Sequence, residues 1–445
     1  MIERIKSWSL TLLVVVSVIL TYQTWTFQPE YEAFEDTTYV ENEPVGETRS
    51  LSEAVWPEQI VLHQDEDMAA IESSDEAFTE FYETLQDSRI ENLVNLTSSG
   101  EAGTEVNEII ENNGGQMAEV IFPTPIAGEL IEELFQIEED TPYSSIETLD
   151  RMYLVDDGPN ADSLKILLVS YQDGGSVFEA QTNFSLSDFR SQYLNNLDAF
   201  PSVFALETPE QSGIERNIYL PEDTSTYSTV SYTTSEIATD NFLRLLFNEP
   251  NYVEQYQEDN GELSYTDGSR MVNIAADGDS FNYVNPIYGE SVESNQGNVI
   301  TSSFDFVNSQ GGWTDEYRLY DIDSAANQEE ATYRMMVQGV PVYDTGEPQT
   351  SITAVKTGGQ IANYSRPLFE LDANPIDIEE NVTLESGRDI VDQMQGQFDM
   401  EEVENVRIGY SVNKDNEVVN FDPSWFIKYG GDWYPFDAAV EEEEE

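Results

Sequence analysis

The sequence predicts an α+β protein of mostly antiparallel sheet, held outside a membrane by one N-terminal transmembrane helix. Three observations lead to this fold class. Residues 7–29 form an uncharged run of 23 residues. Farther along, short alternating runs are separated by Asp-Gly and Gly-Gly turns, which is typical of antiparallel strands. Aromatic residues make up 11% of the 445 residues, too many for a disordered acidic chain.

The composition is strongly acidic and poor in reactive side chains. The chain has 88 Asp and Glu against 18 Lys and Arg, a formal net charge of −70, no cysteine and one histidine. Nucleic acid is excluded as a partner because its phosphates require a basic face. Disulfides, thiolate sites and multi-histidine metal sites are excluded as well, so no metal and no cofactor is expected.

The acidity itself predicts adaptation to salt. The Debye length falls from ~8 Å at ~0.15 M salt to ~3 Å at ~1 M, so salt would relieve the repulsion between surface carboxylates. The functional alternative is cation binding, but no run has the spacing of an EF-hand loop. A solvated acidic surface is the favoured interpretation.

The N-terminal run is long enough to cross a membrane. At ~1.5 Å per residue a helix over residues 7–29 reaches ~34 Å, against ~30 Å for a bilayer core. Arg4 and Lys6 precede it, so residues 1–6 are expected in the cytoplasm and the rest outside. A cleavable signal peptide is the alternative, but it needs a shorter apolar core and small residues at its cleavage site, where residues 21–25 are bulky.

One face of this helix is suited to contact with other membrane helices. Ser17, Thr21 and Thr24 share a stripe at i, i+4 and i+7, and hydroxyls on such a stripe can bond to a neighbouring helix. The predicted contact face comprises Leu10, Leu13, Val14, Ser17, Thr21 and Thr24. The alternative is that the hydroxyls bond to their own helix and face lipid.

The ectodomain is predicted to follow a juxtamembrane linker over residues 30–50. The first α+β domain, residues 51–183, opens a helix with a capping box from Ser73 to Glu76. Its expected strands are 59–63, 118–122, 151–155, 165–171 and 176–182, and a second helix carries the apolar stripe at 130–135.

Two further domains are predicted. The second, an α+β domain over residues 184–287, holds strands 202–207 and 215–220, a helix at 236–247, and a meander around Asp267-Gly268 and Asp277-Gly278. The third, mostly β, spans residues 288–437, and residues 438–445 form an acidic tail. Its expected elements are strands at 299–307, 316–320 and 333–337, a helix at 384–395, and hairpins around 413–417 and Gly430-Gly431.

Candidate site residues are few. His63 lies in an apolar strand run, and a satisfied strand histidine is favoured over a catalytic base. Core packing, including a cross-strand pair of Trp425 with Trp433, is favoured over ligand stacking for the aromatic group Trp313, Tyr317, Tyr320, Trp425, Trp433 and Tyr434. No nucleophile elbow, phosphate loop or zinc-binding helix is present in the sequence, so no catalytic residue and no enzyme activity is predicted.

Several short motifs, in their order along the chain, resemble the YycH family over essentially the whole length. They are the opening at residues 5–15, Tyr22-Gln-Thr-Trp25 with Pro29, Glu119-Val-Ile-Phe-Pro123, Leu245-Leu-Phe-Asn-Glu-Pro250, Tyr265-Thr-Asp-Gly-Ser-Arg270, Gly339-Val-Pro-Val-Tyr343, Asp422-Pro-Ser-Trp425 and Gly430-Gly-Asp-Trp433.

The resemblance implies a membrane-anchored regulator of the YycG (WalK) sensor histidine kinase. It implies three extracytoplasmic domains, the last of them YycI-like, and an anchor helix that contacts the kinase's membrane helices. It further implies that YycI completes a complex that restrains the kinase, without catalytic residues. The competing function is a cell-wall binding or accessory module that holds a glycan or peptide.

Overall fold

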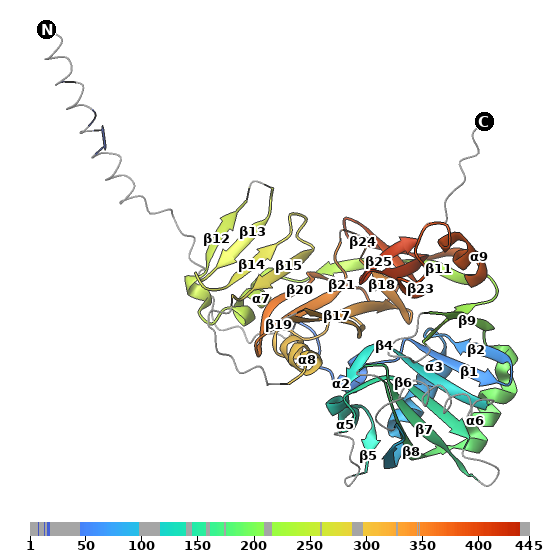
Figure 1. Ribbon diagram of the computed structural model, residues 1–445. Coiled ribbons are helices and arrows are strands. Elements are labelled where there is room, and N and C mark those ends of the chain that lie inside the picture. Colours follow the sequence, from blue (N-terminus) through green and yellow to red (C-terminus); the bar gives the residue numbers. More distant parts are fainter. Residues whose placement is uncertain are drawn as a thin grey trace, which may run out of the picture.

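The computed structural model describes residues 45–97, 116–138, 145–156, 161–172, 175–208, 216–258, 260–286, 297–325, 328–344, 346 and 348–436, with the helical residues Trp8, Leu13, Val16 and Ser17. The strands within these ranges form two sheets and a separate two-stranded hairpin, and Figure 1 shows the two sheets one above the other. The α+β class with mostly antiparallel pairing is confirmed. No helix within the described ranges is both long and apolar enough to span a membrane.

The first sheet, here the N-terminal sheet, takes its strands from β1 to β8. Their order is β2-β1-β4-β6-β7-β8-β3-β5, antiparallel except for the parallel pair β3–β5. The strands are β1 Gln59–Gln64, β2 Asp67–Ile71, β3 Arg89–Asn95, β4 Gln116–Ala127, β5 Gln136–Ile137, β6 Thr148–Asp156, β7 Ser163–Ser170 and β8 Ser176–Ser185.

Helices cover one face of the N-terminal sheet. Phe78, Phe81 and Leu85 of α3 are fully buried, as their helical spacing predicts. The helical elements of this part are α2 Leu51–Ala54, α3 Glu76–Asp87, η1 Gly128–Leu130, α5 Ile131–Leu134, α6 Leu186–Gln192 and η3 Leu194–Ala199. The expected helix at 130–135 is therefore one short turn of α-helix after a 3-10 turn.

The second sheet, here the C-terminal sheet, takes its strands from β11 to β25. The main order is β12-β13-β14-β15-β20-β19-β17-β18-β23-β24-β11-β21, with β16, β22 and β25 paired beside β17, β11 and β24. The strands are β11 Ser225–Glu236, β12 Glu254–Gln257, β13 Leu263–Thr266, β14 Met271–Ile274, β15 Ser280–Val284, β16 Tyr317–Ala325, β17 Gln328–Val337, β18 Val340–Tyr343, β19 Ile352–Thr357, β20 Gln360–Pro367, β21 Phe369–Leu371, β22 Asp377–Leu384, β23 Val403–Asp415, β24 Val418–Tyr429 and β25 Asp432–Phe436.

The predicted meander and the closing hairpins are confirmed. Gly268 and Gly278 adopt φ values of +89° and +82° in the turns that join β13, β14 and β15. Gly430 and Gly431 turn β24 into β25 in the same left-handed region. The helices of this part are α7 Thr239–Leu246, η4 Pro250–Tyr252, α8 Val299–Ser309 and α9 Gly387–Met394.

The strand expected at 299–307 is wrong. These residues form α8, capped by the side chain of Asn298, which accepts a hydrogen bond from the Thr301 N–H. Its buried positions Val299, Ile300, Ser303, Phe304 and Val307 follow a helical spacing rather than an alternating one. The run begins with the β-branched residues Val299, Ile300 and Thr301, which are typical of strands.

The expected capping box at Ser73 is also wrong. Asp75 caps α3, because its side chain accepts from the Ala77 N–H. The Ser73 hydroxyl instead donates to the carbonyl of Gly339, 266 residues away, at 2.6 Å. A long-range contact between the two sheets therefore takes the side chain that the local pattern assigned to the helix.

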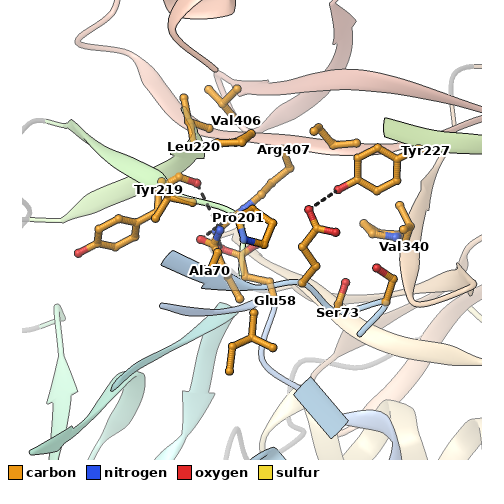
Figure 2. Close-up of a pocket in the computed structure, with 18 of the residues that line it drawn as sticks. Glu58, Ala70, Ser73, Pro201, Tyr219, Leu220, Tyr227, Val340, Val406 and Arg407 are labelled. Atoms are coloured by element: carbon orange, nitrogen blue, oxygen red, sulfur yellow. Dashed lines mark hydrogen bonds and ion pairs between the residues drawn. The ribbon is translucent and has the colours of Figure 1, made fainter. Parts of the chain in front are cut away.

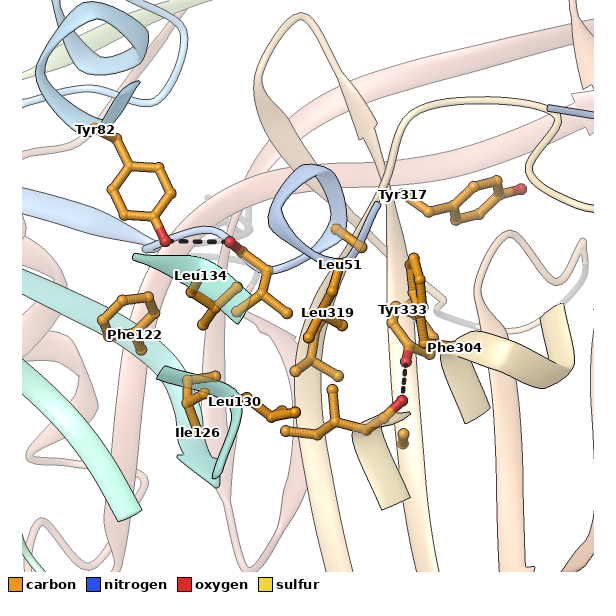
Figure 3. Close-up of a cluster of buried hydrophobic side chains, with 14 of the residues drawn as sticks. Leu51, Tyr82, Phe122, Ile126, Leu130, Leu134, Phe304, Tyr317, Leu319 and Tyr333 are labelled. Carbon is orange, nitrogen blue, oxygen red and sulfur yellow. Dashed lines mark hydrogen bonds between the residues drawn. The ribbon is translucent and has the colours of Figure 1, made fainter. Parts of the chain in front are cut away.

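One hydrophobic core runs through both sheets. Figure 3 shows where they join, with Leu51, Phe122 and Leu134 from the N-terminal part facing Leu319 and Tyr333 of the C-terminal sheet. Because dense apolar packing has little slack, this shared core fixes how the two sheets lie against each other. Where the chain divides into separately folding units stays a prediction.

Candidate functional site

The predicted helix-contact face falls largely outside the described residues. Leu10, Val14, Thr21 and Thr24 are not described, whereas Leu13 and Ser17 are helical and Leu13 is 64% exposed. This face stays a prediction. Within the described residues, a cluster of buried polar groups lies at the interface between the two sheets.

A two-stranded hairpin separates the sheets at this interface. It consists of β9 Val203–Glu207 and β10 Asn217–Pro221, and Figure 1 shows β9 between the N-terminal sheet and α9. Side chains on successive positions of a strand point to opposite faces. Tyr219 packs with the N-terminal sheet, whereas Ile218 and Leu220 pack with α9 and β23. One face of the hairpin thus packs against the N-terminal sheet and the other against the C-terminal part.

A buried carboxylate lies where this hairpin meets the N-terminal sheet. Glu119 of β4 is 1% exposed and pairs with Arg151 of β6. Tyr219 donates its hydroxyl to Glu119 Oε2 at 2.7 Å, and Tyr153 donates to Oε1 at 3.1 Å. His63 Nε2 lies 3.2 Å from Oε2. Strand β4 is buried on both faces, because the hairpin covers the face that the helices leave open.

The pKa of Glu119 shows how strongly its neighbours stabilise the ionised carboxylate. Burial alone would raise the pKa, because it penalises the charged form. The charge of Arg151 and the contact with His63 outweigh burial, and the pKa falls to about 2. The ionised carboxylate therefore holds β1, β4, β6 and the hairpin together.

A second ion pair ties the sheets together directly. Arg407 of β23 donates to Glu58 Oε1 at 2.6 Å and to Gln59 Oε1 at 2.7 Å. Both charged side chains are largely buried, at 12% and 5% exposure. Removing one member of a buried pair leaves the other charge uncompensated, so this contact fixes β23 over β1.

Two cavities flank the Arg407–Glu58 pair. The smaller has a volume of about 90 Å³ and lies between β2, β11, β18 and β23 (Figure 2). Glu72 lines it, burial raises the pKa of that carboxyl, and Tyr227 donates a hydrogen bond to it at 3.3 Å. Because ~10–15 Å³ of such volume is enough to hold one water molecule, this cavity has room for several waters.

The larger cavity, here the charged cavity, has a volume of about 260 Å³. Its walls come from β4, β6 and β10 on one side and from β16, β23 and β24 on the other. The proline pair Pro123 and Pro125 lies at a break in the β4–β6 register and forms part of the wall. Ligand sites occur preferentially at such junctions between structural units.

Residues 45–50, here the docked segment, open the first long described stretch, and they bind the end of α8 and the loop that leads from it to β16 of the C-terminal sheet. Glu47 and Trp313 exchange backbone hydrogen bonds of 2.9 and 2.8 Å. Gly312, at φ +76°, leaves no room for a side chain, since a Cβ there would lie 2.6 Å from the Glu47 carbonyl oxygen. The chain therefore contacts the C-terminal sheet before it enters the N-terminal one.

The aromatic group is used mainly for packing. Trp313, Tyr317, Tyr320 and Trp425 are at most 5% exposed. The pairing of Trp425 with Trp433 is wrong, because in the β24–β25 register Trp425 faces Phe436.

Trp433 packs against Tyr343 with ring centroids 4.7 Å apart. Tyr434 is 45% exposed. His63 is the satisfied strand histidine that was expected, through its contact with Glu119.

Sequence reasoning missed the buried charges. Glu119 is the single charged residue within the apolar run of β4, which is a usable signal because an unpaired charge is rarely buried. Among the described residues, no three His, Cys, Asp or Glu side chains are grouped so as to hold a metal ion. The arrangement is suited to binding and to coupling the two sheets.

Comparison with known proteins covers almost the whole chain. The family model described as YycH protein, N-terminal domain, matches residues 3–192, and the YycH protein, C-terminal domain, matches residues 215–443. A Bacillus subtilis (strain 168) protein named "Two-component system WalR/WalK regulatory protein YycH" is 25% identical over 455 residues, covering 97% of this chain and 96% of that protein.

The fold agrees with the sequence match. The crystal structure of YycH from Bacillus subtilis superimposes with a TM-score of 0.71 at 18% identity, over 88% of this chain and 98% of that one. The second family model alone spans just over half of the chain, and the two together reach from residue 3 to residue 443. The chain belongs to the YycH family.

Proposed function

We propose that this chain is a membrane-anchored regulatory protein that restrains a sensor histidine kinase of the WalK type. The observation that carries the proposal is the relative from Bacillus subtilis, named as a WalR/WalK regulatory protein and aligned over 97% of this chain. The regulator acts by binding, together with a YycI-like partner, and not by catalysis. Its last unit is itself proposed to be YycI-like.

The anchor is residues 7–29, with residues 1–6 in the cytoplasm and the bulk of the chain outside. The uncharged length and the preceding basic residues support this topology. The proposed contact face toward the kinase comprises Leu10, Leu13, Val14, Ser17, Thr21 and Thr24. The ectodomain beyond residue 50 is proposed to fall into three units, 51–183, 184–287 and 288–437.

The helix face alone is too weak for a full switch. Moving a kinase from 99:1 to 1:99 requires ~5.5 kcal/mol of differential binding. Three interhelical hydroxyl contacts at ~0.6 kcal/mol each supply less than ~2 kcal/mol. The ectodomain and the second regulator therefore share the task.

The test is co-purification from host membranes at high salt. The tagged full-length protein is compared with the same ectodomain behind a scrambled membrane helix. Recovery of a WalK-type kinase and a YycI-like protein only with the native helix supports regulation through helix contact, and recovery with both moves the main contact to the ectodomain. Recovery of cell-wall material without a kinase would refute the proposal in favour of an accessory module.

The division of labour has its own measurement. An anchor peptide covering residues 1–36 is expressed beside the kinase, and a kinase-dependent reporter is compared with that of cells carrying the whole protein. The peptide is expected to restrain the kinase only in part. Full repression by the peptide would contradict the role assigned to the ectodomain.

A further inference from the structure

The charged cavity gathers basic side chains that are scarce elsewhere in the chain. Arg151, Arg216, Arg407 and Lys428 line it, four of only 18 Lys and Arg against 88 Asp and Glu. Five carboxylates line the cavity as well, and at the chain's ratio of 88 to 18 they would be accompanied by about one cation rather than four. The concentration of cations at one junction therefore calls for a physical reason.

Three of the four basic groups are matched by a carboxylate. Arg151 pairs with Glu119 and Arg407 pairs with Glu58. Lys428 Nζ lies 2.9 and 2.8 Å from the two oxygens of Asp321. These cations are explained by the fold, since each ion pair holds one strand against another.

Arg216 is the exception. Its guanidinium makes no ion pair and no side-chain hydrogen bond within the described part of the chain. Partial burial lowers the pKa of Arg216, and the nearby positive charge of Arg151 lowers it further. A guanidinium does not give up its proton in proteins, so it cannot escape burial by becoming neutral. Glu58 and Asp150 act on Arg216 from a distance without an ion pair or hydrogen bond, so its guanidinium keeps N–H donors that an anion in the cavity can fill.

A second polar group at the cavity is also without a partner. Tyr171 is 2% exposed, and its hydroxyl has no hydrogen-bond partner among the residues that the structure describes. Buried hydroxyls are usually hydrogen-bonded, so this donor is available to a ligand. Tyr171 lies in the electrostatic neighbourhood of both Arg216 and Arg151.

The opposite end of the cavity is acidic. Asp321 and Asp323 of β16 and Glu404 of β23 line the wall opposite β4, β6 and β10, whereas Arg216 directly precedes β10. The carboxylates and Arg216 therefore lie on opposite sides of the cavity. Only Lys428 offsets the carboxylates of the acidic end.

We propose that the charged cavity binds a small zwitterion of the amino-acid or dipeptide type. Its carboxylate lies against Arg216 and the Tyr171 hydroxyl, and its ammonium group faces Asp323 and Glu404. The volume of about 260 Å³ is below the ~300–1,000 Å³ of sites for drug-sized ligands, which limits the ligand to this size. The site requires both sheets, because Arg216 and Tyr171 face residues of β16 and β23 across it.

The experiment uses isothermal titration calorimetry on the full-length chain. The probes are L-alanine, L-glutamine and L-alanyl-L-alanine, with N-acetyl-alanyl-alanine and alanyl-alanine amide as derivatives that lack one charge each. At least one zwitterion is expected to bind, and removal of either charge is expected to weaken that binding by about tenfold or more. Absence of binding by all three zwitterions, or equal binding by the singly charged derivatives, would overturn the proposal.

Two variants locate the site. Arg216→Gln and Tyr171→Phe are each expected to weaken binding by about tenfold or more. Tyr171→Phe removes only a hydroxyl without a partner, so its urea midpoint should be unchanged and its loss of binding cannot reflect unfolding. Arg190→Gln, which removes an exposed arginine paired with Asp156, is the matched control and should bind normally. Unchanged affinity in both site variants would place any binding elsewhere and refute the assignment.

Discussion

Replacing Glu119 with glutamine should destabilise the protein strongly and in a pH-dependent way. The substitution keeps the shape of the side chain but removes the charge that Arg151 faces. Breaking a buried ion pair by removing one member costs about 3–5 kcal/mol. The pKa gives an independent magnitude, because it falls from the usual 4.5 to about 2. At ~1.4 kcal/mol per unit, ionisation of this group contributes about 3 kcal/mol.

The pH dependence has a definite sign. The pKa of Glu119 is depressed in the folded state, so its contribution is fully present above pH 4.5, the unfolded value, and is lost as the pH falls to about 2. The difference between wild type and Glu119→Gln should therefore be constant from pH 7 to about 5. It should shrink below that range, as the wild-type carboxylate takes up its proton.

Urea unfolding of the full-length chain, followed by tryptophan fluorescence, measures this difference. The titrations are run at several pH values at about 1 M NaCl, which shortens the Debye length to ~3 Å and suppresses changes in surface repulsion. Glu222→Gln is the matched control, because it removes an exposed pair with Arg388 and should cost less than about 1 kcal/mol. A Glu119→Gln effect no larger than the control, or one independent of pH between 5 and 2.5, would refute the reasoning.

Three further predictions concern burial, backbone strain and salt. Burial raises the pKa of Asp315 to about 6 against the usual 3.8, so its stabilising contribution is full below pH 4 and lost as the pH rises through 6. Asp315→Asn should therefore be more stable than wild type by about 1–3 kcal/mol at pH 8 and equal to it near pH 4 in thermal melts, and a less stable variant at pH 8 would contradict this.

Gly312→Ala should release the docked segment, because the new Cβ would clash with the Glu47 carbonyl oxygen, and amide hydrogen exchange at Glu47 and Trp313 should become faster. Gly431→Ala is the control: Gly431 also has a positive φ, +88°, but nothing lies near its Cβ, so this exchange should stay unchanged. The melting temperature should rise between about 0.15 and 1 M NaCl, and equal melting temperatures would rule out salt adaptation.

The sequence predicted those parts of the fold that local chemistry decides. The Asp-Gly and Gly-Gly turns identify their hairpins because only a few residues accept the left-handed backbone there. The sequence of helix α8 resembles a strand, because a short run of mixed apolar and hydroxyl residues fits the two-residue period of a strand as well as the 3.6-residue period of a helix. Ser73 was assigned to a cap because its true acceptor, the Gly339 carbonyl, is 266 residues away.

The interface site was beyond sequence reasoning for the same reason. The apolar run of β4 marks Glu119 as a candidate for burial but does not identify its partners, and among 88 carboxylates nothing local marks Glu58 as buried. Their burial follows from the hairpin β9–β10 covering β4 and from β23 crossing β1, contacts that join residues up to 349 positions apart. The continuous apolar run of β10 in the sequence indicates that both of its faces are buried. It does not indicate that the N-terminal sheet covers one face and α9 with β23 the other.

The docked segment gives the proposed anchor a mechanical route to the charged cavity. Residues 45–50 are hydrogen-bonded to Trp313 in the loop between α8 and β16 and lead at once into α2, which packs at the shared core. A displacement of the chain before residue 45 therefore acts on the junction of the two sheets, where the charged cavity lies. Coupling is reciprocal: a ligand that favours one arrangement of the sheets shifts the docked segment by the same free energy. The proposed ligand of the charged cavity would therefore act on the proposed anchor through this junction.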